Sequence, residues 1–245
     1  MLPENKKLNE MKRLAALPAL ERPFTVRLKF RKVGKLQYIS HLDLQRTFMR
    51  VIVRACIPAW YTKGFNPHAK LVFSTPLSVG AESEYEFLDL RIDKDMSPAE
   101  IMERLNGELT DELRIVDAYI PTTDFSEIAW ATYDIKIKTA GADENLVSEI
   151  KKTLSVSPLM LTKKTKAGEK EIDIIPMIRS TEVELEGGVI TVHATLKANV
   201  GEFLNPEMLV SGLKARCGIL SGNPMEEWYS IMRTSVRKAD LTLFR

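Results

Sequence analysis

A strictly alternating segment near the start of the chain constrains the fold more than any other feature. Residues 24–32 read Phe-Thr-Val-Arg-Leu-Lys-Phe-Arg-Lys, so apolar and polar or basic side chains exchange at every position. Period-2 alternation is typical of a β-strand that lays one face on a hydrophobic core. The segment therefore predicts a half-buried strand with a basic outer face.

The clearest helix in the sequence runs from Ser40 to Cys56. Ser40 followed by Asp43 fits an N-terminal capping pattern, and Pro58 stops the helix. Apolar residues at helical spacing predict a buried stripe, and arginines spaced by four residues predict a basic row along another face. The stripe is Leu44, Phe48, Val51, Ile52 and Ala55, and the row is Arg46, Arg50 and Arg54.

The remaining signals in the first half complete a familiar order of elements. Ser97 and Pro98 predict the start of a second helix that ends near Gly107. Further strands are predicted at 71–74, 84–92 and 113–120. The order strand, helix, strand, strand, helix, strand is that of the split βαβ, or ferredoxin-like, arrangement.

The second half of the chain predicts another α+β unit. Its expected elements are a strand at 132–139, a helix at 143–154, hairpins at 159–175 and 182–197, a helix at 205–216 and a last strand at 228–237. The fold class we expect is therefore α+β, with two ferredoxin-like units in tandem, each an antiparallel sheet with helices on one face. The expected divisions are a tail at 1–21, loose or a short helix, a basic-faced domain at 22–122, and a C-terminal domain at 128–245, with a linker near 121–130.

Composition excludes several classes of protein. No apolar run approaches the ~18–20 residues that span a bilayer, and the charged N-terminus lacks a secretory signal, so we expect a cytoplasmic protein without membrane contact. Cys56 and Cys217 form no C-x-x-C motif, so this chain alone does not hold a typical iron–sulfur cluster. Three scattered histidines do not support a zinc site. No metal and no cofactor is predicted.

Charge is divided sharply along the chain although the net charge is only +2. Residues 22–80 contain eleven Lys and Arg and one acid, Asp43, which gives +10. Residues 81–149 contain six basic and eighteen acidic residues, which gives −12. Such a basic block predicts a polyanionic partner. The main alternative is that the acidic block, beginning with Glu82, Glu84 and Glu86, offsets the charge inside the fold.

Two short clusters carry chemistry that charge alone does not explain. His41 follows the capping residue Ser40 at a predicted helix start, where backbone N–H groups favour anions. Residues 63–70 gather two lysines, a histidine, an asparagine and a phenylalanine in one predicted loop, where basic groups suit phosphates and aromatic groups suit exposed bases. A capped helix and an ordinary surface turn are the structural alternatives.

The candidate residues follow from these patterns. His41 and His68 are the candidates for general acid–base catalysis. The candidate RNA- or partner-binding residues are Arg27, Lys29, Arg31, Ser40, His41, Arg46, Arg50, Arg54, Lys63, Phe65, Asn66, His68 and Lys70.

Three segments resemble the radical SAM-linked protein family, whose domain occurs alone or fused behind a radical SAM enzyme. They are Phe-Arg-Lys-Val-Gly-Lys-Leu-Gln-Tyr-Ile-Ser-His-Leu-Asp-Leu at 30–44, Lys-Gly-Phe-Asn-Pro-His at 63–68 and Pro-Leu-Ser-Val-Gly-Ala-Glu-Ser-Glu at 76–84. The resemblance covers roughly residues 24–220. It implies a radical SAM partner that carries the cluster-binding cysteines, and a link to ribonuclease and ribosomal genes. It supplies no catalytic residues.

Three functions remain open from the sequence. The first is a bacterial RNA-binding or substrate-presenting accessory protein that holds tRNA or rRNA for a radical SAM enzyme, with no DNA specificity. The second is an RNA-processing or RNA-modifying enzyme that uses His41 or His68. The third is a protein adaptor whose basic block docks an acidic partner without RNA.

Overall fold

The computed structural model describes residues 4–156, 158–165 and 168–245, which fold into two compact units. The first unit runs up to Asp124 and also includes Arg245. The second is Phe125–Phe244. The division falls within the segment 121–130, where the sequence predicts a linker.

The first unit has a four-stranded sheet in the order β2-β3-β1-β4, and each neighbouring pair is antiparallel. The elements are α1 (Glu4–Ala16), β1 (Phe24–Lys32), the 3-10 turn η1 (Gly34–Tyr38), α2 (His41–Arg54), β2 (Leu71–Phe73), β3 (Ala81–Ile92), α3 (Pro98–Asn106) and β4 (Leu113–Tyr119). From β1 to β4 they follow the connectivity of the split βαβ arrangement. The N-terminal segment is helical over most of its length, as α1.

Local sequence sets the helix starts of this unit. Ser40 Oγ accepts a hydrogen bond from the Asp43 backbone N–H, and Ser97 Oγ accepts one from that of Glu100. Each side chain satisfies a donor that the first helical turn leaves without an intrahelical acceptor. Both predicted capping patterns are confirmed.

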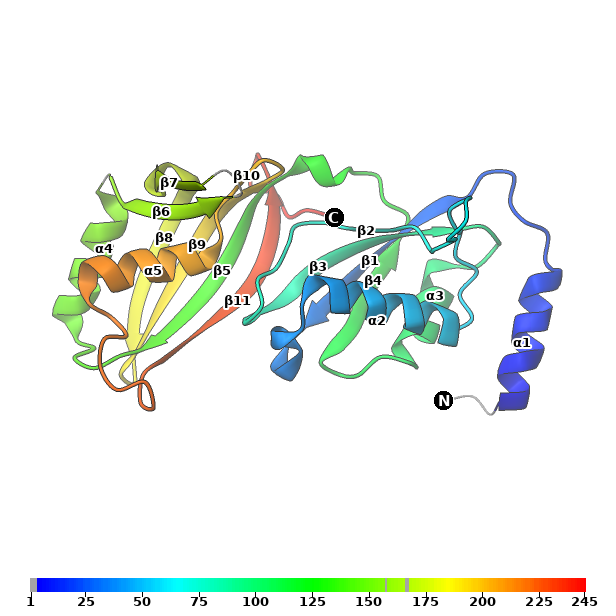
Figure 1. The fold of residues 1–245 in the computed structure, drawn as a ribbon, viewed down its shortest axis with the longest axis horizontal. Helices are drawn as coiled ribbons and strands as arrows, with labels where there is room; N and C mark the ends of the chain where they lie inside the picture. Colours follow the sequence, from blue (N-terminus) through cyan, green and yellow to red (C-terminus); the bar gives the residue numbers. More distant parts are fainter. Residues whose placement is uncertain (1–3, 157, 166–167) are drawn as a thin grey trace. The chain divides into compact units, whose positions relative to one another are not determined.

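The core of the first unit lies between one face of its sheet and the helices α2 and α3, which cover that face (Figure 1). The alternate apolar positions of β1 and β3 meet the apolar stripe of α2 there. The principal buried residues are Val26, Leu28, Phe30, Phe48, Ile52, Leu88, Leu90, Ile101 and Leu105. The predicted helix stripe is confirmed.

The second unit repeats this connectivity with two additions, an inserted hairpin and a short extra strand. Its elements are η2 (Phe125–Glu127), β5 (Ile128–Lys138), α4 (Glu144–Ser155), β6 (Met160–Thr165), β7 (Gly168–Asp173), η3 (Ile175–Met177), β8 (Ile178–Glu186), β9 (Val189–Asn199), β10 (Glu202–Phe203), α5 (Pro206–Cys217) and β11 (Trp228–Lys238). Strand β9 lies between β5 and β8, and β5 lies between β9 and β11. The hairpin β6–β7 is inserted between α4 and β8 and forms its own two-stranded sheet, and the short strand β10 pairs with β9.

A glycine allows the inserted hairpin to approach α5. A Cβ at Gly212 would meet Leu159 Cδ2 at 3.1 Å and Leu161 Cδ1 at 3.4 Å. Leu159 and Ile174 are both buried. The base of the hairpin is therefore packed on the unit, whereas most of β7 is exposed.

The structure confirms the α+β class. In the part of the chain that it describes, no helix is long and apolar enough to cross a membrane.

Candidate nucleic-acid interface

The basic strand face predicted for β1 is largely neutralised within the first unit. Arg27 is 1% exposed, and its Nε and Nη2 donate to the two carboxylate oxygens of Asp89 at 2.7 and 2.8 Å. Its Nη1 donates to Thr123 Oγ1 at 2.9 Å. A buried guanidinium held in this way does not reach a phosphate outside the protein. The expectation that Arg27 is a surface contact residue is corrected.

The other cations of this face also have partners. Lys29 Nζ lies 3.4 Å from the ring centroid of Tyr85, and Arg31 donates twice to the Asp111 carbonyl oxygen. On β3, the Arg91 guanidinium lies 5.4 Å from the Trp60 ring centroid. Alternation correctly gives the side of the sheet on which these residues lie, but their charges are used inside the unit.

Two arginines of the row on α2 lie close to acidic side chains. Arg54 pairs with Glu108 at 3.0 Å, and Arg46 lies 3.4 Å from Asp43. The hydrogen bond from Ser40, helped by Arg46, holds the pKa of Asp43 below its usual value. Arg50 is exposed. The exposed face of α2 therefore keeps positive charge at Arg46 and Arg50.

Acidic residues from later in the chain offset most of the basic block. The first 124 residues contain nineteen Lys and Arg and seventeen Asp and Glu, a formal charge of +2. Two ion pairs illustrate this. Arg27 pairs with Asp89 and Arg54 pairs with Glu108, and both acids belong to the acidic block. Glu82 instead accepts a hydrogen bond from the Gly34 backbone N–H at 2.5 Å. Much of the positive charge of residues 22–80 is thus offset inside the fold by acids of the block that follows it, as the alternative interpretation of the sequence expects.

The loop 63–70 differs from the strand face because its functional side chains are exposed. Phe65 is fully exposed, and Lys63, Asn66, His68 and Lys70 are exposed as well. Gly64, which directly precedes Phe65, has a φ of +149°, a conformation that other residues rarely adopt. The loop thus presents an aromatic ring among basic side chains.

Hydrogen bonds at its base hold this loop. Tyr61 and Ala69 form a β-bridge, and the Thr62 backbone N–H donates to the His68 carbonyl oxygen at 2.9 Å. The His68 backbone N–H donates to Thr62 Oγ1, and His68 Nδ1 lies 3.2 Å from that oxygen and 3.1 Å from the Asn66 carbonyl oxygen. Through these contacts His68 helps to hold the two ends of the loop together. Sequence reasoning missed Thr62, because an isolated threonine gives no signal of such a role.

His41 lies in a second cluster, at the start of α2. Its ring meets that of Phe73 edge-on, with centroids 5.0 Å apart. A narrow cleft beside it is lined by Ser40, His41 and Phe73 and also by Lys32 and Glu86, which are 3% and 5% exposed. Sequence reasoning missed Lys32 and Glu86 as site residues. The sequence did contain a signal for them, because Lys32 and Glu86 each stand at a position that alternation assigns to the apolar face of its strand.

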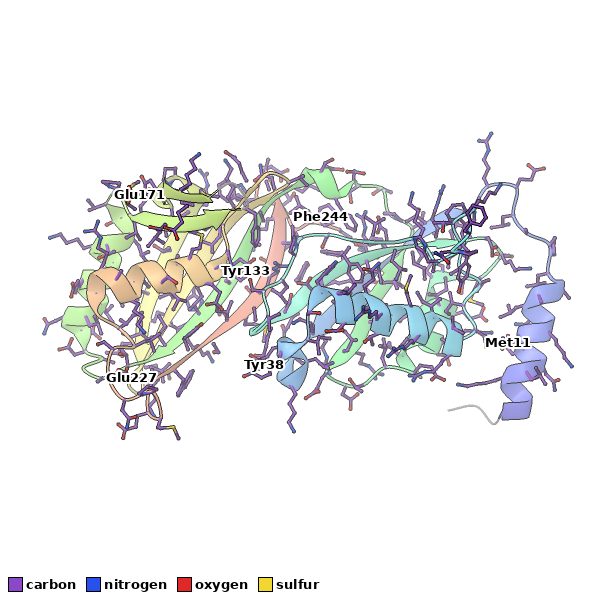
Figure 2. The ribbon with its side chains drawn as sticks, in the orientation of Figure 1. Met11, Tyr38, Tyr133, Glu171, Glu227 and Phe244 are labelled. Carbon is purple, nitrogen blue, oxygen red and sulfur yellow. The ribbon has the colours of Figure 1, made fainter. Side chains whose placement is uncertain are left out.

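The cluster around His41 joins two of the quoted segments, 30–44 and 76–84. The Gly80 backbone N–H donates to the Gln37 carbonyl oxygen at 2.9 Å, in addition to the contact between Glu82 and Gly34. Tyr38, at the end of η1, is 68% exposed (Figure 2). Tyr38 and His41, three residues apart in the sequence, are both exposed.

The structure does not bring His41 and the 63–70 loop into one site. His41 contacts Phe73, which pairs with Leu88 of β3. The residues before the loop pair four positions further along β3, where Ala59 faces Ile92. Four strand residues span roughly 13 Å. The two clusters are separate, so neither histidine completes a site with the other.

No metal site is evident in the described ranges, where no group of three His, Cys, Asp or Glu side chains is placed to hold an ion. Cys56 and Cys217 are free thiols, half-buried. Burial raises the pKa of Cys217.

A protein-family model described as "Uncharacterized protein conserved in bacteria (DUF2344)" matches residues 25–206. The chain belongs to this family. A search of curated proteins found no match. Among solved structures, a protein provisionally described as a glycine cleavage system transcriptional repressor aligns over 88% of this chain and 98% of its own, with 11% identity and a TM-score of 0.23. A likeness at that score carries no argument about this member of the family.

Proposed function

We propose that this family member is an RNA-binding accessory protein that uses the 63–70 loop as its principal contact. The first unit, of ferredoxin-like connectivity, would carry the loop and leave it exposed. The resemblance of residues 30–44, 63–68 and 76–84 to radical SAM-linked proteins supports a radical SAM enzyme as the partner that acts on the RNA, with tRNA or rRNA as the RNA.

The observation that carries the proposal is the fully exposed ring of Phe65 on a braced loop between Lys63 and Lys70. Covering an exposed phenylalanine ring removes its apolar surface from water, which favours a complex in which a partner group lies on the ring. A base can stack on the ring, and ammonium groups on either side suit the neighbouring phosphates. Arg46 and Arg50 provide a second positive surface for the backbone of a longer RNA.

The test is binding to labelled total cellular RNA across a salt series. Phe65→Ala should weaken binding on the order of 10- to 100-fold, because stacking of one base contributes about 1–3 kcal/mol. Lys63→Ala with Lys70→Ala should lower the salt slope by about 1.4, since each phosphate contact on single-stranded RNA contributes about 0.7.

Matched controls come from the second unit. Val200 is 89% exposed, so Val200→Ala removes an exposed apolar side chain, and Lys151→Ala with Lys152→Ala removes two exposed charges from α4. Both should bind RNA as the wild type does. Equal losses of RNA affinity in the control variants and the loop variants would show that binding depends on generic charge alone, and this would contradict the proposal.

The two alternative functions give different outcomes in the same assay. An RNA-processing enzyme would turn over the bound RNA, and His41→Ala or His68→Ala would abolish turnover while leaving affinity near normal. A protein adaptor would bind no RNA class above background but would form a nuclease-resistant complex with the radical SAM protein.

A further inference from the structure

Tyr38 is a second exposed aromatic residue of the first unit, and it lies at the end of α2 that is remote from the 63–70 loop. Its ring is 68% exposed, and it ends η1 just before the N-cap of α2 (Figure 2). At the other end, Val53 in the last turn of α2 lines the same small hollow as Tyr61, at the base of the loop. The exposed rings of Tyr38 and Phe65 are therefore separated by the length of one helix.

The exposed face of α2 connects these two ends. Leu42, Arg46 and Arg50 follow one another at intervals of four residues, so their side chains are neighbours along one face of the helix. Val53, three residues after Arg50, continues that face into the last turn. All four side chains are exposed, whereas the buried stripe of α2 lies on the opposite face. A strip of cationic and apolar side chains thus runs along the helix from the Tyr38 end to the loop end.

Charge along this strip favours a phosphate backbone. Residues 38–70 contain five Lys and Arg and a single acid, Asp43, which lies 3.4 Å from Arg46. Of the five cations, Arg54 is paired with Glu108. The others, all exposed, are Arg46, Arg50, Lys63 and Lys70. Cations spaced along the helix and continued into the loop suit successive phosphates of one strand.

The length of α2 sets the length of such a strand. Its 14 residues span about 21 Å, at a rise of 1.5 Å per residue. A stacked nucleic-acid strand advances about 3.4 Å per nucleotide, so about six stacked nucleotides span the helix, and fewer do so when the strand is extended. The rings of Tyr38 and Phe65 can stack only on bases whose faces are free, and base pairs inside a double helix do not offer such faces.

We propose that α2 guides an unpaired RNA stretch of about four to six nucleotides, with one base stacked on Phe65 and another on Tyr38. The phosphates between these bases lie along Arg46 and Arg50. This inference rests on the proposed function: it names the class of RNA that the same site takes, and it adds Tyr38 as a binding residue.

The probes are end-labelled RNA oligonucleotides made of adenine and cytosine, which do not pair with themselves at pH 7. A twelve-nucleotide strand is compared with the same strand annealed to its complement and with a trinucleotide, whose two steps cover about 7 Å when stacked. Fluorescence anisotropy with the full chain measures each affinity. Tyr38→Ala removes the exposed ring and Tyr38→Phe keeps it. Met225→Ala removes a side chain that is 91% exposed on the second unit and is the matched control. Phe65→Ala reports on the proposed function itself.

For the twelve-nucleotide strand, Tyr38→Ala should weaken binding on the order of 10-fold, because one stacked base is lost. Tyr38→Phe and Met225→Ala should bind as the wild type does, and the circular dichroism of Tyr38→Ala should be unchanged. The duplex should bind on the order of 10-fold more weakly than the strand, because pairing covers the faces of its bases. The trinucleotide should also bind more weakly, and Tyr38→Ala should leave it bound at Phe65.

Several outcomes would overturn this inference and leave the proposed function standing. They are total cellular RNA or the twelve-nucleotide strand bound through Phe65 without any dependence on Tyr38, a duplex bound as tightly as the strand, and a trinucleotide bound as tightly as the longer strand. A loss in Tyr38→Phe equal to that in Tyr38→Ala would count against stacking in the same way. Binding that depends on neither ring would overturn this inference and the proposed function together.

Discussion

Arg27 illustrates how one residue decides the meaning of a charge pattern. Its guanidinium lies in the unit at 1% exposure, against an Asp89 side chain that is 17% exposed. A bidentate pair of this kind is strongly coupled, since removal of one partner leaves the other charge desolvated. Arg27 is thus part of the structure of the sheet rather than of its surface.

The first prediction concerns this pair. Arg27→Ala should lower the free energy of unfolding by about 3–5 kcal/mol, because Asp89 would keep its charge without its partner. The double variant Arg27→Ala with Asp89→Ala should lose less than the sum of the two single variants. Urea denaturation followed by circular dichroism measures both. Wild-type stability together with reduced RNA affinity would instead return Arg27 to the contact surface.

Exposure was the part of the candidate site that sequence could not supply. Alternation assigns Arg27, Lys29 and Arg31 to one side of β1 correctly, but it does not show which acids and rings lie on that side. Asp89 and Tyr85 come from β3, more than fifty residues later, so the pairing depends on strand register. The 63–70 loop was easier to identify, because it contains functional side chains and turn residues without a competing apolar pattern.

At the scale of elements, α1 is attached to its unit by one buried leucine and by ion pairs. Leu14 is its buried apolar residue, while Leu8 and Met11 are each 51% exposed. Glu10 pairs with Arg104 at 2.6 Å, and Lys7 pairs with Glu108 at 2.5 Å. Partly exposed ion pairs of this kind contribute about 0–1 kcal/mol each. We therefore expect α1 to open more readily than α2 or α3.

The second prediction follows from the titration of Glu10. Hydrogen bonds from Arg13 and Arg104 lower the pKa of Glu10 from 4.5 to about 2. The pair with Arg13 stabilises α1 as a helix, and the pair with Arg104 stabilises its docking. Both contributions are fully present above pH 4.5 and are lost as the pH falls toward 2. Glu10→Gln should increase hydrogen exchange of α1 amides at pH 7 while exchange in β1 is unchanged.

The control for that experiment is Glu226→Gln, an exposed acid in the second unit. It should leave exchange in α1 at the wild-type level. If α1 exchanges equally slowly in Glu10→Gln, the helix is held by its apolar contacts and the ion pairs are incidental.

Elements were predictable where several local signals coincided. The Ser40 and Ser97 caps, the stripe of α2 and the alternation of β1 all agree with the structure within a residue or two. The ends of β3 and β5 were less predictable: β3 begins at Ala81 and β5 at Ile128, both before the expected starts. Strand ends depend on pairing with distant strands, which local sequence does not encode.

At the scale of the whole molecule, the division into two compact units predicts two cooperative unfolding events. Leu88 is fully buried in the first unit and Ile135 in the second. Replacing either by alanine should cost about 2–5 kcal/mol. In calorimetry, Leu88→Ala should lower the temperature of one transition and Ile135→Ala that of the other. A single transition shifted equally by both variants would show that the units unfold as one.

The inserted hairpin β6–β7 makes the second unit a natural scaffold for grafting. The strands β8, β9, β5 and β11 complete their pairing without it, while Leu159 and Ile174 fix its base. Loop tips outside a completed sheet tolerate changes of length better than the sheet itself does. The outer part of this hairpin could therefore be replaced by a binding peptide or a reporter module, and the first unit of the protein would stay unaltered.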